Sequence, residues 1–286
     1  MDWMERFNAA IRYLEENLTG EIEYEKLGQM ACCSSYHFQR MFGYLAGMPL
    51  SEYIRKRKMS LAAVDLQGNN AKIIDVAAKY GYASPTAFTR AFQSVHGVSP
   101  SSVKSEGRPI KSFPPIAIQI TVKGVEEMEY RIQTKEAFRT VGRSFPLSRE
   151  IEQNFLEVPK MWQGAVADGT LAQIISLMNG QPRGVLGISV CNDKEEWRYY
   201  IAVCSCAGID HSLEEYIVPS CTWAIFPGAG TGKSIQELEK RIVTEWLATS
   251  GYEFAKGPDI EVYLNPDPQD TAYEVWIPVK KKQAQP

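Results

Sequence analysis

The sequence Phe38-Gln39-Arg40-Met41-Phe42 has a second copy, Phe88-Thr89-Arg90-Ala91-Phe92, in which the arginine recurs after 50 residues. A serine and a short apolar stretch come before the Phe-x-Arg-x-Phe core in each copy. Residues four apart lie on one face of a helix, so the two phenylalanines of each copy are expected to face a core. The repeat predicts two helix-turn-helix units in tandem, the arrangement in which the second helix of each unit enters a DNA groove.

Residues 2 to about 105 are predicted to form seven short helices and no strand. The first helix ends at the stop signal Thr19-Gly20, and the longest is expected over 51–66. Helical spacing of apolar residues is clearest in the first helix, at Trp3, Phe7, Ile11, Leu14 and Leu18. This part of the chain is therefore expected to be all-α.

The two units differ at the turn between their helices. Superposing them matches Gly28 with Ala77, small residues suited to a close helix crossing, and Ser35 with Ser84. The turn position is Gly81 in the second unit, where glycine tolerates a positive φ, but Cys32 in the first. The first unit thus departs from the usual turn chemistry.

The expected recognition helices carry side chains suited to base edges. A helix starting at Ser35 places Tyr36, Gln39 and Arg40 on one exposed face. Glutamine bonds adenine and arginine bonds guanine in the major groove. One exposed arginine is usually solvated surface, but two in matching frames favour base readout. We expect the first helix to supply most of the discrimination, and the second to add Arg90 and backbone contacts. The candidate DNA contacts are Ser35, Tyr36, Gln39, Arg40, Arg55, Thr86, Thr89 and Arg90.

Charge is distributed unevenly along the 286 residues, although the net charge is only -3. Residues 26–104 contain ten Lys/Arg and three Asp/Glu, whereas the chain from residue 111 contains 18 basic and 23 acidic residues. A basic module fits a polyanion, and an acidic one a different partner. The basic block 55–58 is expected to be largely solvated, with Arg55 reaching a phosphate.

A proline-rich stretch separates two regions of different character. Residues 107–115 hold three prolines without periodicity and are expected to form a linker. Strands alternate with helices after it, in two similar halves. We expect an N-terminal all-α domain over 1–107, a linker over 108–117 and an α+β domain over 118–286. The chain is long enough for both.

Two late strands place acids beside aromatic rings. Alternation puts Glu274 and Trp276 on one face of the last strand, and Glu261 and Tyr263 on one face of the preceding strand. A carboxylate beside aromatic rings suits an organic cation. An exposed strand acid near an ordinary core tryptophan is the alternative, and neutral ligands remain open.

The N-terminal motifs resemble the DNA-binding domain of the AraC/XylS family of bacterial transcription regulators. The resemblance rests on 34–42, 53–59, 73–92 and Gly97-Val98-Ser99-Pro100, and covers roughly 6–106. It implies two helix-turn-helix subdomains joined by a long helix, with recognition helices in successive major-groove turns about 34 Å apart. Arg40 and Arg90 would then each read a base in double-stranded promoter DNA, and RNA polymerase is an expected partner.

The C-terminal region resembles the GyrI-like effector-binding domain over roughly 128–282. The similar motifs are 223–228, 245–247, 260–263 and 274–278. The resemblance implies two β-α-β-β halves enclosing a cleft, with the acid of the last strand, Glu274, facing a small-molecule effector. Further candidate ligand contacts are Trp276, Tyr263, Trp223 and Tyr200.

Three functions compete at this stage. The first is a ligand-responsive transcription regulator for a drug-like or metabolite effector. The second keeps DNA binding but makes the C-terminal domain a protein-interaction or stability module. The third is a GyrI-like hydrolase with Glu274 as base and Tyr263 as helper. We favour a non-enzyme, because the sequence offers no nucleophile motif, no phosphate loop and only His211 in this domain.

Cysteine usage and hydropathy favour a cytoplasmic protein without metal or cofactor. No leader-like segment and no apolar stretch of about 20 residues is present. The six cysteines form no Cys-x-x-Cys pair, so buried thiols in a reduced compartment are favoured over a metal or redox site.

Overall fold

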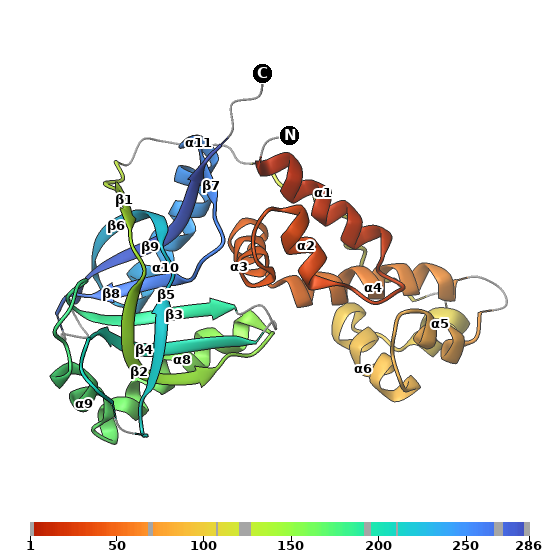
Figure 1. Ribbon diagram of the computed structural model, residues 1–286. Coiled ribbons are helices and arrows are strands. Elements are labelled where there is room, and N and C mark those ends of the chain that lie inside the picture. The colour runs from red at the N-terminus through yellow and green to blue at the C-terminus, as the bar shows by residue number, and fades with distance from the viewer. Residues whose placement is uncertain are drawn as a thin grey trace.

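The computed structural model describes residues 3–67, 71–106, 108–119, 127–191, 196–209, 211–265 and 271–282. Its N-terminal half is helical and its C-terminal half is a sheet with helices, as the sequence predicts (Figure 1). The N-terminal helices are α1 (Trp3–Glu16), α2 (Tyr24–Met30), α3 (Ser35–Ala46), α4 (Leu50–Leu66), α5 (Ile73–Lys79), α6 (Pro85–His96) and α7 (Pro100–Glu106).

The two helix-turn-helix units share their caps. The Ser34 and Ser84 hydroxyls accept hydrogen bonds from backbone N–H groups at the starts of α3 and α6, and Gly47 and Gly97 end these helices in the left-handed conformation. Ser34, rather than Ser35, is therefore the counterpart of Ser84.

The turns of the two units have matching backbone geometry despite different residues. Cys32 has φ 57° and Gly81 has φ 81°. Gly28 fits a close crossing, because a Cβ there would lie 2.7 Å from the Ser34 carbonyl carbon. Phe38, Phe42, Phe88 and Phe92 are fully buried, which confirms the expected core faces.

Helix α4 links the two units and forms hydrogen bonds with the segment 108–119 that follows them. Arg57 is buried, not solvated as expected, because its guanidinium binds the Glu15 carboxylate and the Phe113 carbonyl. Tyr53 accepts a hydrogen bond from the Ile116 N–H, and Asn8 of α1 bonds Ile118. The extended segment 108–119 thus runs along the N-terminal helical half.

The C-terminal half contains one nine-stranded antiparallel sheet, in which β7 pairs only with β9. The order of the other strands is β1-β6-β9-β8-β3-β4-β2-β5. The strands are β1 (Arg131–Lys135), β2 (Phe138–Pro146), β3 (Val185–Cys191), β4 (Trp197–Cys204), β5 (Glu214–Val218), β6 (Cys221–Gly230), β7 (Tyr252–Phe254), β8 (Asp259–Tyr263) and β9 (Thr271–Lys281). The helices are α8 (Ile151–Ala167), α9 (Thr170–Ser176), α10 (Gly232–Arg241), the π-helical turn η1 (Ile242–Trp246) and α11 (Leu247–Thr249).

Two β-α-β-β halves make up this sheet. Strands β2, β3 and β4 with α8 form the first half, and β6, β8 and β9 with α10 the second. They join at β3 and β8, where Gly187 pairs with Glu261. Each half also has one extra strand at the edge of the sheet. Strand β1 pairs with β6 of the second half and β5 pairs with β2 of the first half. The predicted duplication is confirmed, and β5, β7 and α9 are additions that the sequence did not indicate.

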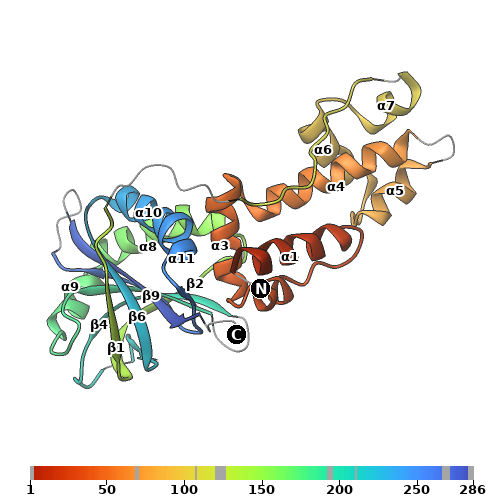
Figure 2. The same ribbon diagram turned by 90° about the horizontal axis from the view of Figure 1, so that it is seen from above.

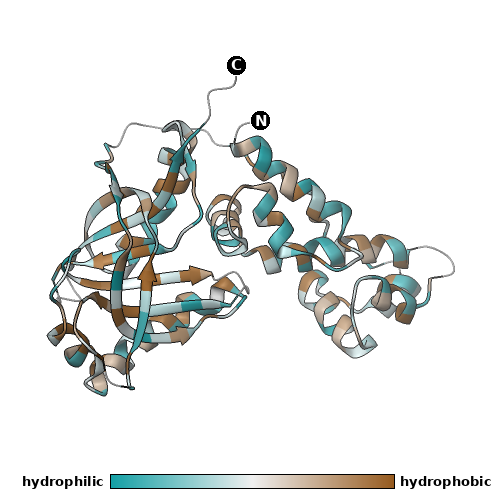
Figure 3. Ribbon diagram, viewed as in Figure 1, coloured by the Kyte–Doolittle hydropathy of each residue, from teal (hydrophilic) through white to brown (hydrophobic). Residues whose placement is uncertain are grey.

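The helices cover one face of the sheet, and the sheet curls over its other face (Figures 1 and 2). The curled side encloses a cluster formed by strand residues alone, among them Ile188, Trp223 and Trp276. Residues of high hydropathy recur along the strands and helices in both halves of the chain (Figure 3). Strand alternation therefore sends one set of side chains into this cluster and the other towards the helices.

The N-terminal helical half contacts the sheet domain through α1 and α3. Figures 1 and 2 show α3 beside the sheet domain and α5 and α6 at the far end of the molecule. Apolar residues of α3 and of the η1 region belong to one continuous buried cluster. Arg6 of α1 also forms an ion pair with Glu253 of β7.

Candidate functional site

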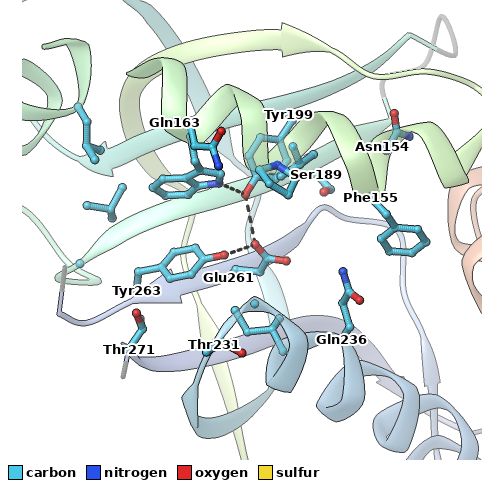
Figure 4. Close-up of a pocket in the computed structure, with 18 of the residues that line it drawn as sticks. Asn154, Phe155, Gln163, Ser189, Tyr199, Thr231, Gln236, Glu261, Tyr263 and Thr271 are labelled. Carbon is cyan, nitrogen blue, oxygen red and sulfur yellow. Dashed lines mark hydrogen bonds between the residues drawn. The ribbon is translucent and has the colours of Figure 1, made fainter. Parts of the chain in front are cut away.

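A cavity of about 860 Å³ lies on the helix-covered face of the sheet, where the two halves meet. Helix α8 forms one wall and α10 the opposite wall, with β3, β4 and β8 behind them (Figure 4). The walls are largely apolar and come from α8, α9 and α10, including Phe155, Val158, Trp162, Leu171, Ile175 and Ile235. The size and lining suit a drug-sized organic molecule.

Glu261 is the acid of this cavity. It accepts hydrogen bonds from the hydroxyls of Tyr263, at 2.8 Å, and Tyr199, at 3.2 Å (Figure 4). The Trp162 indole N–H donates to the Tyr199 oxygen at 2.9 Å. Gly187 leaves room for this network, because a Cβ there would lie 2.2 Å from the Tyr199 oxygen.

The Glu261 carboxylate lacks a cationic partner of its own. Burial and the nearby carboxylate of Glu239 raise its pKa to about 7, although the two tyrosine hydroxyls and Arg40 act in the opposite direction. Across the described ranges, no Lys, Arg or His side chain forms an ion pair with Glu261. A buried carboxylate without a cation favours binding of a positively charged guest.

The aromatic rings beside Glu261 are neutral hydrogen-bond donors. Burial, followed by the charge of Glu261, raises the pKa of both Tyr199 and Tyr263 well above the usual range. The Trp162 and Tyr263 ring centroids are 4.9 Å apart in an edge-to-face arrangement. The cavity lining therefore contains two carboxylates, Glu261 and Glu239, and that of Glu261 lies beside aromatic surfaces of the kind used in cation recognition.

Glu274 does not face this cavity, contrary to the expectation. It lies on the opposite face of the sheet, where it accepts hydrogen bonds from Arg131 and from the Trp276 indole, both at 2.8 Å. The alternation expected for β9 is confirmed, because Tyr273 and Val275 pack towards the helices. Glu274 therefore lies on the face of the sheet away from the helices and does not line this cavity.

The other predicted ligand contacts divide in the same way. Tyr263 lines the cavity, as does Tyr199, which was not predicted. Trp223, Trp276 and Tyr200 belong to the cluster enclosed on the curled side of the sheet and do not reach the cavity. The sequence feature that could have indicated Glu261 is its position two residues before Tyr263 on β8, which places both side chains on one face of the strand.

The predicted DNA contacts of the second unit lie on an accessible helix face. Thr86 and Arg90 of α6 are exposed and Thr89 is half-buried, while Phe88 points to the core. Arg55 of α4 is also exposed. These positions fit the expected readout face, and their contacts with DNA stay a prediction.

The corresponding face of α3 is covered, contrary to the expectation that it is exposed. Ser35 and Gln39 are buried, and Tyr36 and Arg40 pack on the sheet domain. The Tyr36 and Trp197 ring centroids are 5.1 Å apart, and the Arg40 guanidinium lies 3.0 Å from the Asp259 carboxylate. Sequence periodicity found the face of α3, but a second domain occupies it.

Comparison with known proteins matches both halves separately. A helix-turn-helix domain model matches residues 27–106, and a GyrI-like small molecule binding domain model matches residues 128–280. The HTH-type transcriptional activator AarP of Providencia stuartii is 39% identical over 89 residues, which are 31% of this chain and 66% of AarP. The chain thus spans just under two thirds of that relative.

Two further proteins extend the comparison. The multiple antibiotic resistance protein MarA of Escherichia coli K12 is 34% identical over 93 residues, 32% of this chain and 73% of MarA. The structure of SAV2435 bound to tetraphenylphosphonium aligns with a TM-score of 0.47 and 23% identity, over 54% of this chain and 94% of that chain.

Fold and cavity together define a helix-turn-helix DNA-binding protein with a small-molecule-binding domain. The chain belongs to the AraC/XylS family of transcription regulators and carries a C-terminal GyrI-like domain. In the described parts of the chain, no helix has the length and apolar character to cross a membrane. The same residues contain no group of three His, Cys, Asp or Glu side chains placed to hold a metal.

Proposed function

We propose that this regulator responds to a lipophilic organic cation bound in the cavity beside Glu261. The observation that carries the proposal is a buried carboxylate that accepts two hydroxyl hydrogen bonds and, among the described Lys, Arg and His side chains, has no ion-pair partner. A permanently charged cation would neutralise the Glu261 carboxylate, which the two neutral hydroxyls do not do. The apolar walls would contact the rest of the molecule.

Calorimetric titration of the full-length protein with tetraphenylphosphonium tests this proposal. Binding is expected for the wild type, together with much weaker binding of triphenylphosphine oxide, a neutral comparator of similar shape. Glu261→Gln should lower the affinity for the cation roughly 100-fold, because it removes one partner of a buried charge pair.

Glu274→Gln is the matched control. It removes an acid from the same domain, but Glu274 lies on the other face of the sheet. Equal loss of cation affinity in both variants, or equal binding of the neutral comparator by the wild type, would remove Glu261 from ligand selection.

On the DNA side, we assign base and phosphate contacts to the predicted faces of α3 and α6 and to Arg55. Arg90 lies exposed on α6, in the frame of the repeated motif. RNA polymerase is the proposed further partner, since the relative AarP is named a transcriptional activator. The proposed division of the chain is DNA-binding domain 1–107, linker 108–117 and effector domain 118–286, in the cytoplasm.

A further inference from the structure

The first recognition helix forms part of the wall of the effector cavity. Tyr36 and Arg40 of α3 line the same cavity as Glu261. The Tyr36 hydroxyl lies 3.4 Å from the Ser189 hydroxyl of β3, and its ring contacts Trp197 of β4. The cavity that would receive the effector is therefore completed by the DNA-binding domain.

Arg40 acts as an internal cation at this site. Its guanidinium lies 3.0 Å from the Asp259 carboxylate and forms a second ion pair with Glu239, which also borders the cavity. The Arg40 side chain is only 12% exposed. The Tyr44 hydroxyl of α3 donates to the other Glu239 oxygen at 2.8 Å. Glu239 thus holds α3 through two side chains.

Several titratable side chains surround Arg40. Three carboxylates, Glu239, Asp259 and Glu261, lie around one arginine, and His37 of α3 is 2.8 Å from Asp259. A cation entering beside Glu261 would be attracted by Glu239 and would repel Arg40. It would therefore weaken the ion pairs that hold α3.

The docked arrangement also contains imperfections. A void of about 20 Å³ lies between α3 and the sheet domain, beside His37, Arg40 and Phe254. Within the described ranges, the Asp259 Oδ1 atom is buried and has no hydrogen-bond partner. An unpaired buried oxygen costs free energy, so the surroundings of Asp259 are less stable than its ion pairs alone suggest.

Docking and two-site DNA readout exclude each other. Gln39 is buried and Arg40 is paired with carboxylates of the sheet domain, whereas Thr86 and Arg90 of α6 remain accessible. In this arrangement only the second unit presents its predicted readout face. Ligand and DNA then favour the same released state, which makes their effects on each other reciprocal.

We propose that Arg40 occupies the anionic rim of the effector cavity as an intramolecular latch, and that a bound organic cation displaces it and frees α3 for DNA. This inference rests on the proposed effector function. It assigns Arg40 two alternative partners, the carboxylates Glu239 and Asp259 in the docked state and DNA in the released state.

Asp259→Asn tests the latch, because Asp259 binds Arg40 and His37 but does not line the cavity. The full-length protein first selects a duplex from a random library in the presence of tetraphenylphosphonium. Affinity for that duplex is then measured with and without the cation. The wild type should bind about 5- to 150-fold more tightly with the cation, the usual range of coupling. Asp259→Asn should bind tightly without it.

Glu215→Gln is the matched control, because it removes an acid that pairs with Arg139 on β2, away from α3. Tyr44→Phe provides a second and milder variant, since it deletes one donor to Glu239 without leaving a buried charge. Hydrogen exchange of α3 peptides supplies a readout independent of DNA. Exchange over 35–46 should rise when tetraphenylphosphonium is added.

The outcomes separate the latch from the effector site. No calorimetric binding of tetraphenylphosphonium to the wild type would refute the effector site. Binding that leaves α3 exchange and DNA affinity unchanged would overturn the latch alone. DNA affinity of Asp259→Asn and Tyr44→Phe equal to that of Glu215→Gln would overturn it as well.

Discussion

At the scale of single residues, Gly187 leaves the space in which the Tyr199 hydroxyl donates a hydrogen bond to Glu261. Its missing side chain lets the Tyr199 hydroxyl reach Glu261, which pairs with Gly187 across β3 and β8. Gly187→Ala should cost about 1–3 kcal/mol of stability, because the new methyl overlaps the Tyr199 oxygen. Denaturant unfolding measures the cost, and Gly208→Ala is the control, since a Cβ there meets nothing. Equal stability of the two variants would contradict this account.

Burial of Glu261 should also make stability depend on pH. Its pKa is about 7 in the fold and 4.5 ordinarily, so the folded state holds more protons than the unfolded chain between these values. Stability contributed at Glu261 is therefore present below about pH 4.5 and is lost as pH rises through 7. Glu261→Gln should gain thermal stability relative to the wild type between pH 5 and pH 8. The same difference in melting temperature between Glu261→Gln and the wild type at pH 5 and at pH 8 would contradict this expectation.

Cation affinity should rise over the same pH range. The groups facing Glu261 are Glu239, Arg40 and the neutral hydroxyls of Tyr199 and Tyr263. Protonated Glu261 carries no charge, so a cation must release its proton below about pH 7. Affinity for tetraphenylphosphonium should fall up to about tenfold per pH unit below that point. Titrations in buffers of different ionisation enthalpy should show proton release at pH 6 but little at pH 8.

At the scale of elements, the two helix-turn-helix units use one backbone geometry with unequal residues. Cys32 holds a left-handed conformation that Gly81 adopts without strain. Cys32→Gly should stabilise the first unit by about 0.5–1 kcal/mol, whereas Gly81→Ala should destabilise the second by about 1 kcal/mol or more. Guanidinium unfolding measures the change in the free energy of unfolding of each variant, which should be positive for Cys32→Gly and negative for Gly81→Ala. Destabilisation by Cys32→Gly would show that its thiol contributes more than the strain removes.

Elements were largely predictable from local patterns, but the face of the sheet that carries the cavity was not. Helical spacing and the repeated Phe-x-Arg-x-Phe core indicated all seven N-terminal helices. Alternation on β9 correctly separated Glu274 from Val275, and on β8 it grouped Glu261 with Tyr263. Which group faces the cavity depends on strand order and on the gap between α8 and α10. Both arise from contacts distant in sequence, which periodicity does not encode.

At the scale of the whole molecule, domain docking decides which predicted residues are accessible. The apolar and charged face of α3 has the composition of a DNA-reading face, and the sheet domain uses the same chemistry to hold it. Local sequence cannot distinguish an arginine that contacts a DNA base from one that forms an ion pair with a carboxylate such as Asp259. The prediction of an exposed face therefore failed for α3 and succeeded for Thr86 and Arg90 of α6.

This arrangement predicts different costs for substitutions in the two units. Arg90→Ala should weaken binding to the selected duplex by about 1–3 kcal/mol with or without tetraphenylphosphonium. Gln39→Ala should do so only with the cation, because Gln39 is buried in the docked state. Mobility-shift titrations of both variants under both conditions measure the four values. Equal costs for Gln39→Ala with and without cation would indicate that α3 is not regulated.

We propose that an organic cation binds beside Glu261 on the helix-covered face of the sheet. A crystal structure of the full-length protein with tetraphenylarsonium tests this most directly, because anomalous scattering locates the arsenic atom without reference to any assumed pose. We expect one strong peak between α8 and α10, within the cavity lined by Glu261, Tyr199 and Tyr263. A peak beside Glu274 and Arg131 on the opposite face, or an empty cavity at saturating ligand, would contradict it.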